Sequence, residues 1–159
     1  MAGSDRRILT THTGSLPRPE DLIRIMWAKG DGIPVDQDAL EERIASAVDE
    51  IVKKQVDAGI SIVNDGEMSK SSYAIYVKDR LKGFGGKGIE NYFFQDLADY
   101  PKSADIVAAN PGRKKRYAPA CNAAIEVEDE DAAAKDMINL ASAAKKYGAF
   151  GTFSSAASP

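Results

Sequence analysis

One long amphipathic helix pattern, followed at once by a short β-rich stretch, constrains this fold more than any other feature of the sequence. Asp38 is predicted as the N-cap of this helix, with Glu41 as its capping-box partner. Gly59 is predicted to stop it. The apolar face has helical spacing and consists of Leu40, Ile44, Val48, Ile51 and Val52. Residues 60–63, which follow directly, are rich in β-branched side chains and predict a strand.

A second strand is expected near the N-terminus, where Ile8 and Leu9 lead a β-branched run. A turn over residues 10–19 follows it, and a helical pattern then runs from Glu20 to Gly30. The order of strand, helices and strand describes a βαβ unit, whose two strands run parallel with a right-handed connection. Because parallel strands end at the same edge of a sheet, we expect the turns that follow them to share one ligand-binding rim.

The two turns on this rim carry side chains suited to an amino acid. In the first turn, Gly14 allows the backbone to approach a ligand and Ser15 offers a hydroxyl, which together suit a carboxylate. In the second turn, Asp65-Gly66-Glu67, the carboxylate of Glu67 suits an ammonium group. The pair therefore predicts a site for a zwitterion, bound by both of its charged ends.

The same residues also have other interpretations. Gly14-Ser15 fits a simple turn before a helix. Glu67 fits a partner for the dipole of a following helix, with Ser69 as an alternative cap. A further hypothesis is unrelated acid–base chemistry by His12 together with Glu67 or Asp65.

The middle of the chain predicts a long excursion. Residues 71–81 carry apolar side chains that read as a helix. The loop 83–88 matches the spacing G-x-G-x-x-G. A dinucleotide-binding loop follows a strand and begins a helix, whereas this loop follows a predicted helix and begins none, so dinucleotide binding is rejected. From residue 83 to 115 we expect an irregular excursion with short helices near 93–97 and 103–108. Such excursions are often lids or contact surfaces.

The last part of the chain predicts two more strands on either side of a helix. Residues 116–127 should contain a strand, with Cys121 as a small buried residue. The helix pattern over 129–146 starts with acids and ends with lysines before Gly148, as the helix dipole favours. Residues 149–155 predict the next strand. The sequence thus predicts one α/β domain with about four parallel strands and their helices.

Composition restricts the partners and the compartment. The 159 residues carry a net charge of -3 and a pI near 5.2, which gives no reason to expect a nucleic acid or a membrane. The basic cluster 113–116 suits phosphate or a polyglutamyl tail, or is a solvated face. One cysteine and one histidine exclude an intrachain disulfide and disfavour a His/Cys metal cluster. With a polar start and no apolar run of about 20 residues, a cytoplasmic protein is expected.

Three motifs taken together carry a family resemblance. They are Gly14-Ser15-Leu16-Pro17-Arg18-Pro19, Asp65-Gly66-Glu67 and Ala156-Ala157-Ser158-Pro159. In this order they resemble the catalytic barrel of the cobalamin-independent methionine synthase family. The resemblance implies a (β/α)8 TIM barrel in which zinc activates homocysteine as a thiolate, which takes a methyl group from a methyltetrahydrofolate.

The resemblance also implies residue roles, and it has gaps. Gly14 and Ser15 match contacts to the amino-acid carboxylate, and Glu67 matches the acid that holds the ammonium. Arg116 and Tyr117 match a folate-contacting pair at the third strand. The family's zinc ligands, a His-x-Cys pair, a glutamate and another cysteine on later strands, have no counterpart in this chain, nor does its late histidine proton donor.

These gaps lead to an expectation about completeness. A whole barrel needs about 250 residues, so we expect the first half of a barrel that is inactive alone. A missing C-terminal half or a second copy in a homodimer would complete it. The alternatives are a stand-alone half-barrel that self-associates as a binding or assembly module, and a related thiol alkyltransferase such as epoxyalkane:coenzyme M transferase.

Overall fold

The structure is a computed structural model that describes residues 8–72, 76–85, 95–109 and 120–156. Its contacts divide the chain into two units. The first unit combines Met1–Val77 with Asp129–Pro159, and the second is Lys78–Glu128. The turns predicted to form the ligand site both belong to the first unit.

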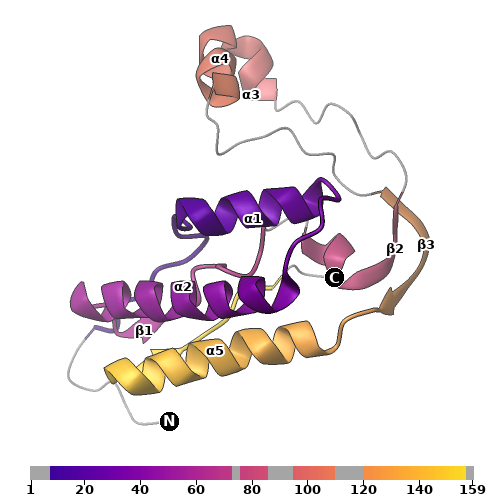
Figure 1. The fold of residues 1–159 in the computed structure, drawn as a ribbon. Helices are drawn as coiled ribbons and strands as arrows, with labels where there is room; N and C mark the ends of the chain where they lie inside the picture. The colour runs from indigo at the N-terminus through magenta and orange to yellow at the C-terminus, as the bar shows by residue number, and fades with distance from the viewer. Residues whose placement is uncertain (1–7, 73–75, 86–94, 110–119, 157–159) are drawn as a thin grey trace. The chain divides into compact units, whose positions relative to one another are not determined.

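Three helices form most of the first unit. They are α1 (Glu20–Gly30), α2 (Gln37–Asp57) and α5 (Asp131–Tyr147), and α2 and α5 run side by side (Figure 1). The long helix pattern is confirmed as α2, but its predicted cap at Asp38 is wrong. Asp36 has the extended backbone of a cap and its Oδ1 accepts a hydrogen bond from the Ala39 N–H at 3.1 Å. Asp38 already lies inside the first turn.

Short parallel strands contact helices α2 and α5. Strand β1 (Ile62–Val63) pairs in parallel with β4 (Gly151–Thr152), and Thr11 makes a parallel bridge to Ile62 on the other side. The predicted parallel relation between the first strand and β1 is therefore confirmed, although the first strand is reduced to this single bridge. The turns after Thr11, β1 and β4 leave the sheet at the same end.

The core of the first unit fills the space between the helices and β1. It is made of apolar side chains from α1, α2, α5, β1 and the turn after β1, including Leu22, Val48, Val52, Val63, Met68 and Leu140. At the surface, ion pairs join α2 to α5, from Lys135 to Glu41 and from Lys146 to Asp49, both at 2.8 Å. The burial of these apolar side chains supplies most of the free energy that holds the short strands in place.

The second unit contains an antiparallel strand pair and two short helices. Strand β2 (Leu81–Gly85) pairs with β3 (Ala120–Val127), and the helices are α3 (Gln95–Asp99) and α4 (Pro101–Ala109). The two helices lie close to the positions predicted within the excursion. Residues 86–94 and 110–119, with Arg116, Tyr117 and the basic cluster, lie outside the described residues.

Three predictions about this region are wrong. Instead of a helix over 71–81, the described part has the 3-10 turn η1 (Tyr76–Asp79) and then β2. Gly83 lies at the register shift between Lys82 and Phe84, where at φ +91 a Cβ would lie 2.6 Å from the Ala124 carbonyl oxygen of β3, so only glycine allows this close approach. The predicted third strand, β3, is antiparallel instead of parallel, and Cys121 on it is exposed instead of buried.

The fold is therefore a mixed α/β arrangement of helices and a few strands. Two of the four expected parallel strands, β1 and β4, are present as strands in the described part, with Thr11 as a bridge beside them. Among the described helices, none has the length and apolar character that a bilayer crossing requires.

Candidate functional site

The turn after Thr11 and the turn after β1 are held against each other by hydrogen bonds. The Leu16 N–H donates to the Gly66 carbonyl oxygen at 3.1 Å, and the Asn64 side-chain amide donates to the His12 carbonyl oxygen at 2.6 Å. Gly14 has φ +96, a left-handed conformation that lets the first turn reverse toward the second. The two turns therefore form one structure, although about 50 residues separate them.

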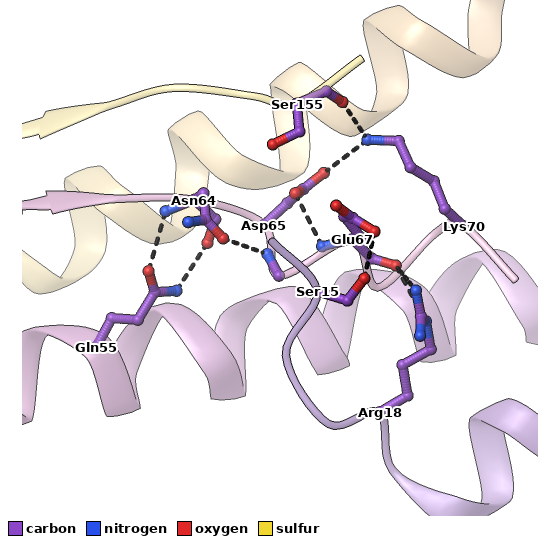
Figure 2. A network of polar contacts seen from close by, with 9 residues as sticks. Ser15, Arg18, Gln55, Asn64, Asp65, Glu67, Lys70 and Ser155 are labelled. Atoms are coloured by element: carbon purple, nitrogen blue, oxygen red, sulfur yellow. Dashed lines mark hydrogen bonds and ion pairs between the residues drawn. The ribbon is translucent and has the colours of Figure 1, made fainter. Parts of the chain in front are cut away.

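A glutamine of α2 holds the end of β1. The Gln55 side chain accepts a hydrogen bond from the Asn64 N–H at 3.1 Å and donates to the Asn64 carbonyl oxygen at 2.8 Å (Figure 2). The Asn64 side chain in turn accepts from the Gly66 N–H at 2.8 Å. Sequence reasoning missed Gln55, although an amide between Val52 and Val56 on an apolar helix face is a signal of a buried polar partner.

The turn after β1 directs the Glu67 side chain toward the first turn. Gly66 and Glu67 both have left-handed backbones, at φ +60 and +58, and the Glu67 N–H donates to Asp65 Oδ1 at 3.0 Å. The Ser15 hydroxyl donates to Glu67 Oε2 at 2.5 Å (Figure 2). The structure thus brings two sequence-predicted site residues into direct contact.

Two basic side chains accompany the two acids of this turn. Arg18 donates from Nε and Nη2 to the Glu67 carbonyl oxygen, at 3.1 and 2.9 Å. Lys70 Nζ lies 3.8 Å from Asp65 Oδ2. Burial lowers the pKa of the Arg18 guanidinium, while the nearby Glu67 and Asp65 carboxylates act to raise it. Since two acids face two bases, the charges within the cluster balance.

The Glu67 carboxylate keeps unused hydrogen-bonding capacity. Glu67 is 3% exposed, and from the described residues its carboxylate accepts a hydrogen bond only from Ser15, at Oε2. Arg18 binds the backbone oxygen of Glu67 and leaves the carboxylate to other donors. A carboxylate can accept several hydrogen bonds, so Oε1 retains the capacity to accept more. Chemically, the site suits a cationic donor such as an ammonium group.

His12 lies in the same turn, but its ring does not share in the hydrogen bonds of Ser15 and Glu67. Its Nε2 is buried and has no hydrogen-bond partner among the described residues, and its ring makes no hydrogen bond to Asp65 or Glu67 there. Its backbone oxygen, bonded to Asn64, has a structural role. The acid–base hypothesis for His12 therefore draws no support from a direct contact.

The donors present do not fit the zinc site that the resemblance implies. The sequence has one histidine and one cysteine, where the family uses a histidine, two cysteines and a glutamate. His12 belongs to the first unit and Cys121 to the second. Within the described ranges, no three histidine, cysteine, aspartate or glutamate side chains gather closely enough to hold a metal ion.

Comparison with known proteins gives partial matches to methionine synthases. Over 75 residues, 47% of this chain, it is 37% identical to a methionine synthase from Sulfolobus acidocaldarius and 33% identical to one from Saccharolobus islandicus. The same length is 33% identical to a 5-methyltetrahydropteroyltriglutamate–homocysteine methyltransferase from Bifidobacterium longum subsp. infantis.

These matches cover a small part of each relative. The matched segment spans 22% of the two archaeal proteins and 10% of the bacterial one. No protein-family description matches the chain, and no solved structure does so. The similarity is to methionine synthases, and it is confined to about half of this chain.

Proposed function

We propose that this chain provides the amino-acid-binding part of a methyltransferase of the cobalamin-independent methionine synthase family, which methylates homocysteine with a methyltetrahydrofolate. The observation that carries the proposal is the contact between Ser15 and Glu67, made where two parallel segments end. The partial identity to methionine synthases supports the choice of homocysteine over other amino acids.

In this proposal the two turns bind opposite ends of homocysteine. The ammonium donates to the Glu67 carboxylate, whose Oε1 accepts nothing from the described residues. The Ser15 hydroxyl, which donates to Glu67 here, rotates to donate to the ligand carboxylate beside Gly14. Because homocysteine is a zwitterion at its α-carbon, binding keeps the local charge balanced, and the thiol points away from both turns toward the methyl donor.

The proposal also includes the expected architecture. The first unit would be part of a (β/α)8 barrel, in which β1, β4 and the segment at Thr11 are neighbouring parallel strands and α2 and α5 are outer helices. Arg116 and Tyr117 would contact the folate. The remaining strands, with the donors that activate the thiol, would come from a C-terminal half or from a second copy.

Isothermal titration calorimetry with L-homocysteine tests the proposal. Wild type should bind, and Glu67→Gln should bind about tenfold more weakly or worse, because the charge-assisted hydrogen bond to the ammonium is lost. Glu41→Gln, which removes a surface carboxylate of α2, is the matched control and should bind as wild type does. The desamino analogue 4-mercaptobutyrate should bind both proteins equally weakly.

The same titration separates the alternatives. If wild type and Glu67→Gln bind L-homocysteine equally, the proposed site is wrong. Binding of 2-mercaptoethanesulfonate, which has no ammonium, with the same affinity in both proteins would favour a thiol alkyltransferase of the coenzyme M type. Absence of thiol binding would favour a module without this chemistry.

A self-associating module is the second candidate, and the surface of α5 favours it. Met137 and Ile138 on α5 are 64% and 62% exposed, and Phe150 just after this helix is 48% exposed. Exposed large apolar side chains on one helix are typical of an interface. Multi-angle light scattering should then show a dimer that Met137→Lys converts to a monomer. A monomeric wild type at high concentration would contradict this candidate.

A further inference from the structure

Lys70 is the most completely buried charged side chain of the candidate site. It is 2% exposed, and it lies three residues after Glu67 in the same turn. Its Nζ donates to the Ser155 carbonyl oxygen at 2.7 Å, lies 3.8 Å from Asp65 Oδ2, and sits 5.5 Å from the centre of the Tyr76 ring. An ammonium is expensive to bury unless such partners surround it.

These contacts connect the ends of three segments of the sheet. Ser155 follows β4, and Asp65 follows β1. Asp65 uses Oδ2 toward Lys70 and Oδ1 to accept the Glu67 N–H, so one carboxylate links the buried cation to the Glu67 backbone. Glu67 then reaches Ser15 in the turn after Thr11 (Figure 2).

We propose that Lys70 is a positioning residue for the amino-acid site: its ammonium orients Asp65, and Asp65 holds Glu67 in the backbone conformation that aims its carboxylate at Ser15. The ligand in this proposal is the one named in the proposed function, on which it rests. The segment after β4 becomes part of the site in this way, although it supplies no ligand contact.

The conformation of Glu67 explains why such support is needed. A non-glycine residue at φ +58 is strained, and the strain persists only when neighbouring groups hold the residue in place. The hydrogen bond from the Glu67 N–H to Asp65 Oδ1 opposes the return to an ordinary conformation. The buried cation beside the other oxygen of Asp65 favours the side-chain orientation that makes this bond.

The double variant Asp65→Asn/Lys70→Met tests the proposal. Lys70→Met alone would leave the Asp65 carboxylate buried without its cation and endanger folding. The double variant removes both charges and keeps an oxygen on residue 65 that can accept the Glu67 N–H. The matched control is Asp49→Asn/Lys146→Met, which removes an ion pair of similar type from the surface between α2 and α5.

The first readout is amide hydrogen exchange without ligand. In the double variant the Glu67 N–H should exchange about tenfold faster or more, while the Val52 N–H inside α2 keeps its wild-type rate. In the control variant the Glu67 N–H should not accelerate more than the Val52 N–H, because this ion pair contributes to the stability of the unit as a whole. If Lys70 serves overall stability alone, both amides will accelerate together or neither will, and the proposal is overturned.

The second readout is the affinity for L-homocysteine. It should fall about tenfold in the double variant and stay unchanged in the control. An unchanged affinity in the double variant would also overturn the proposal. If wild type does not bind L-homocysteine, the proposed function fails, and the exchange of the Glu67 N–H still decides the role of Lys70.

Discussion

The left-handed backbone of Glu67 leads to a prediction with an unusual sign. Glu67→Gly should fold more stably than Glu67→Ala, by about 1 kcal/mol, because a side chain at φ +58 costs about 1–2 kcal/mol that glycine avoids, and glycine's larger unfolded-state entropy returns part of it. Both variants lose the Ser15 hydrogen bond and the buried carboxylate. Those losses cancel in the comparison, so the difference reports on the backbone.

Thermal unfolding followed by circular dichroism measures this difference. For a domain of this size, about 1 kcal/mol corresponds to roughly 2–4 °C in Tm. The same pair of substitutions at Glu42, inside α2 and exposed, is the control, and there the alanine variant should be more stable by about 1 kcal/mol. If alanine is also the more stable at Glu67, the left-handed turn is wrong, and so is the direction assigned to its side chain.

Three further predictions concern the turns and the surface around the site. Gly66→Ala should cost about 2–4 kcal/mol in urea unfolding, since at φ +60 its Cβ would lie 3.1 Å from the Leu16 Cβ, which can yield only if the backbone shifts. Gly32→Ala, at φ +76 in open space, should cost only about 1 kcal/mol, and equal losses would contradict the packing. Gln55→Leu should cost about 2–4 kcal/mol because it leaves the Asn64 N–H and carbonyl oxygen unpaired in the interior, and a neutral result would mean that water replaces the amide. Hydrogen bonds from Lys146 and Tyr147 of α5 lower the pKa of Asp49 below its ordinary 3.8. Their contribution to the stability of the fold is therefore present above pH 3.8 and is lost as the pH falls through the lowered pKa. A Tm series from pH 6 to pH 2 should therefore fall less steeply for Asp49→Asn than for wild type, and identical slopes would contradict the ion pair.

The periodic parts of the fold were predictable from local sequence. Helix α2 follows from its repeating apolar positions and its closing glycine, and the parallel arrangement follows from the order of strand, helices and strand. The meeting of the turns that carry Ser15 and Glu67 follows in turn, because parallel strands end together.

The remaining features depend on partners far along the chain. Nothing near Lys70 in the sequence indicates burial, because its partner Ser155 lies 85 residues away. The apolar side chains over 71–81 fit a helix locally, but residues from Leu81 onward pair with β3, about 40 residues further along the chain. The cap of α2 shifted to Asp36 because several acids in that region compete, and only the backbone conformation selects among them.

In the proposed site, Glu67 holds the ammonium of an amino acid that Ser15 helps to bind, and a crystal structure of this chain soaked with L-homocysteine would show the contact itself. We expect the ligand nitrogen about 2.7–3.2 Å from a Glu67 carboxylate oxygen, with the Ser15 hydroxyl turned to the ligand carboxylate. A ligand bound with its ammonium away from Glu67, while the Ser15 to Glu67 hydrogen bond stays intact, would contradict it.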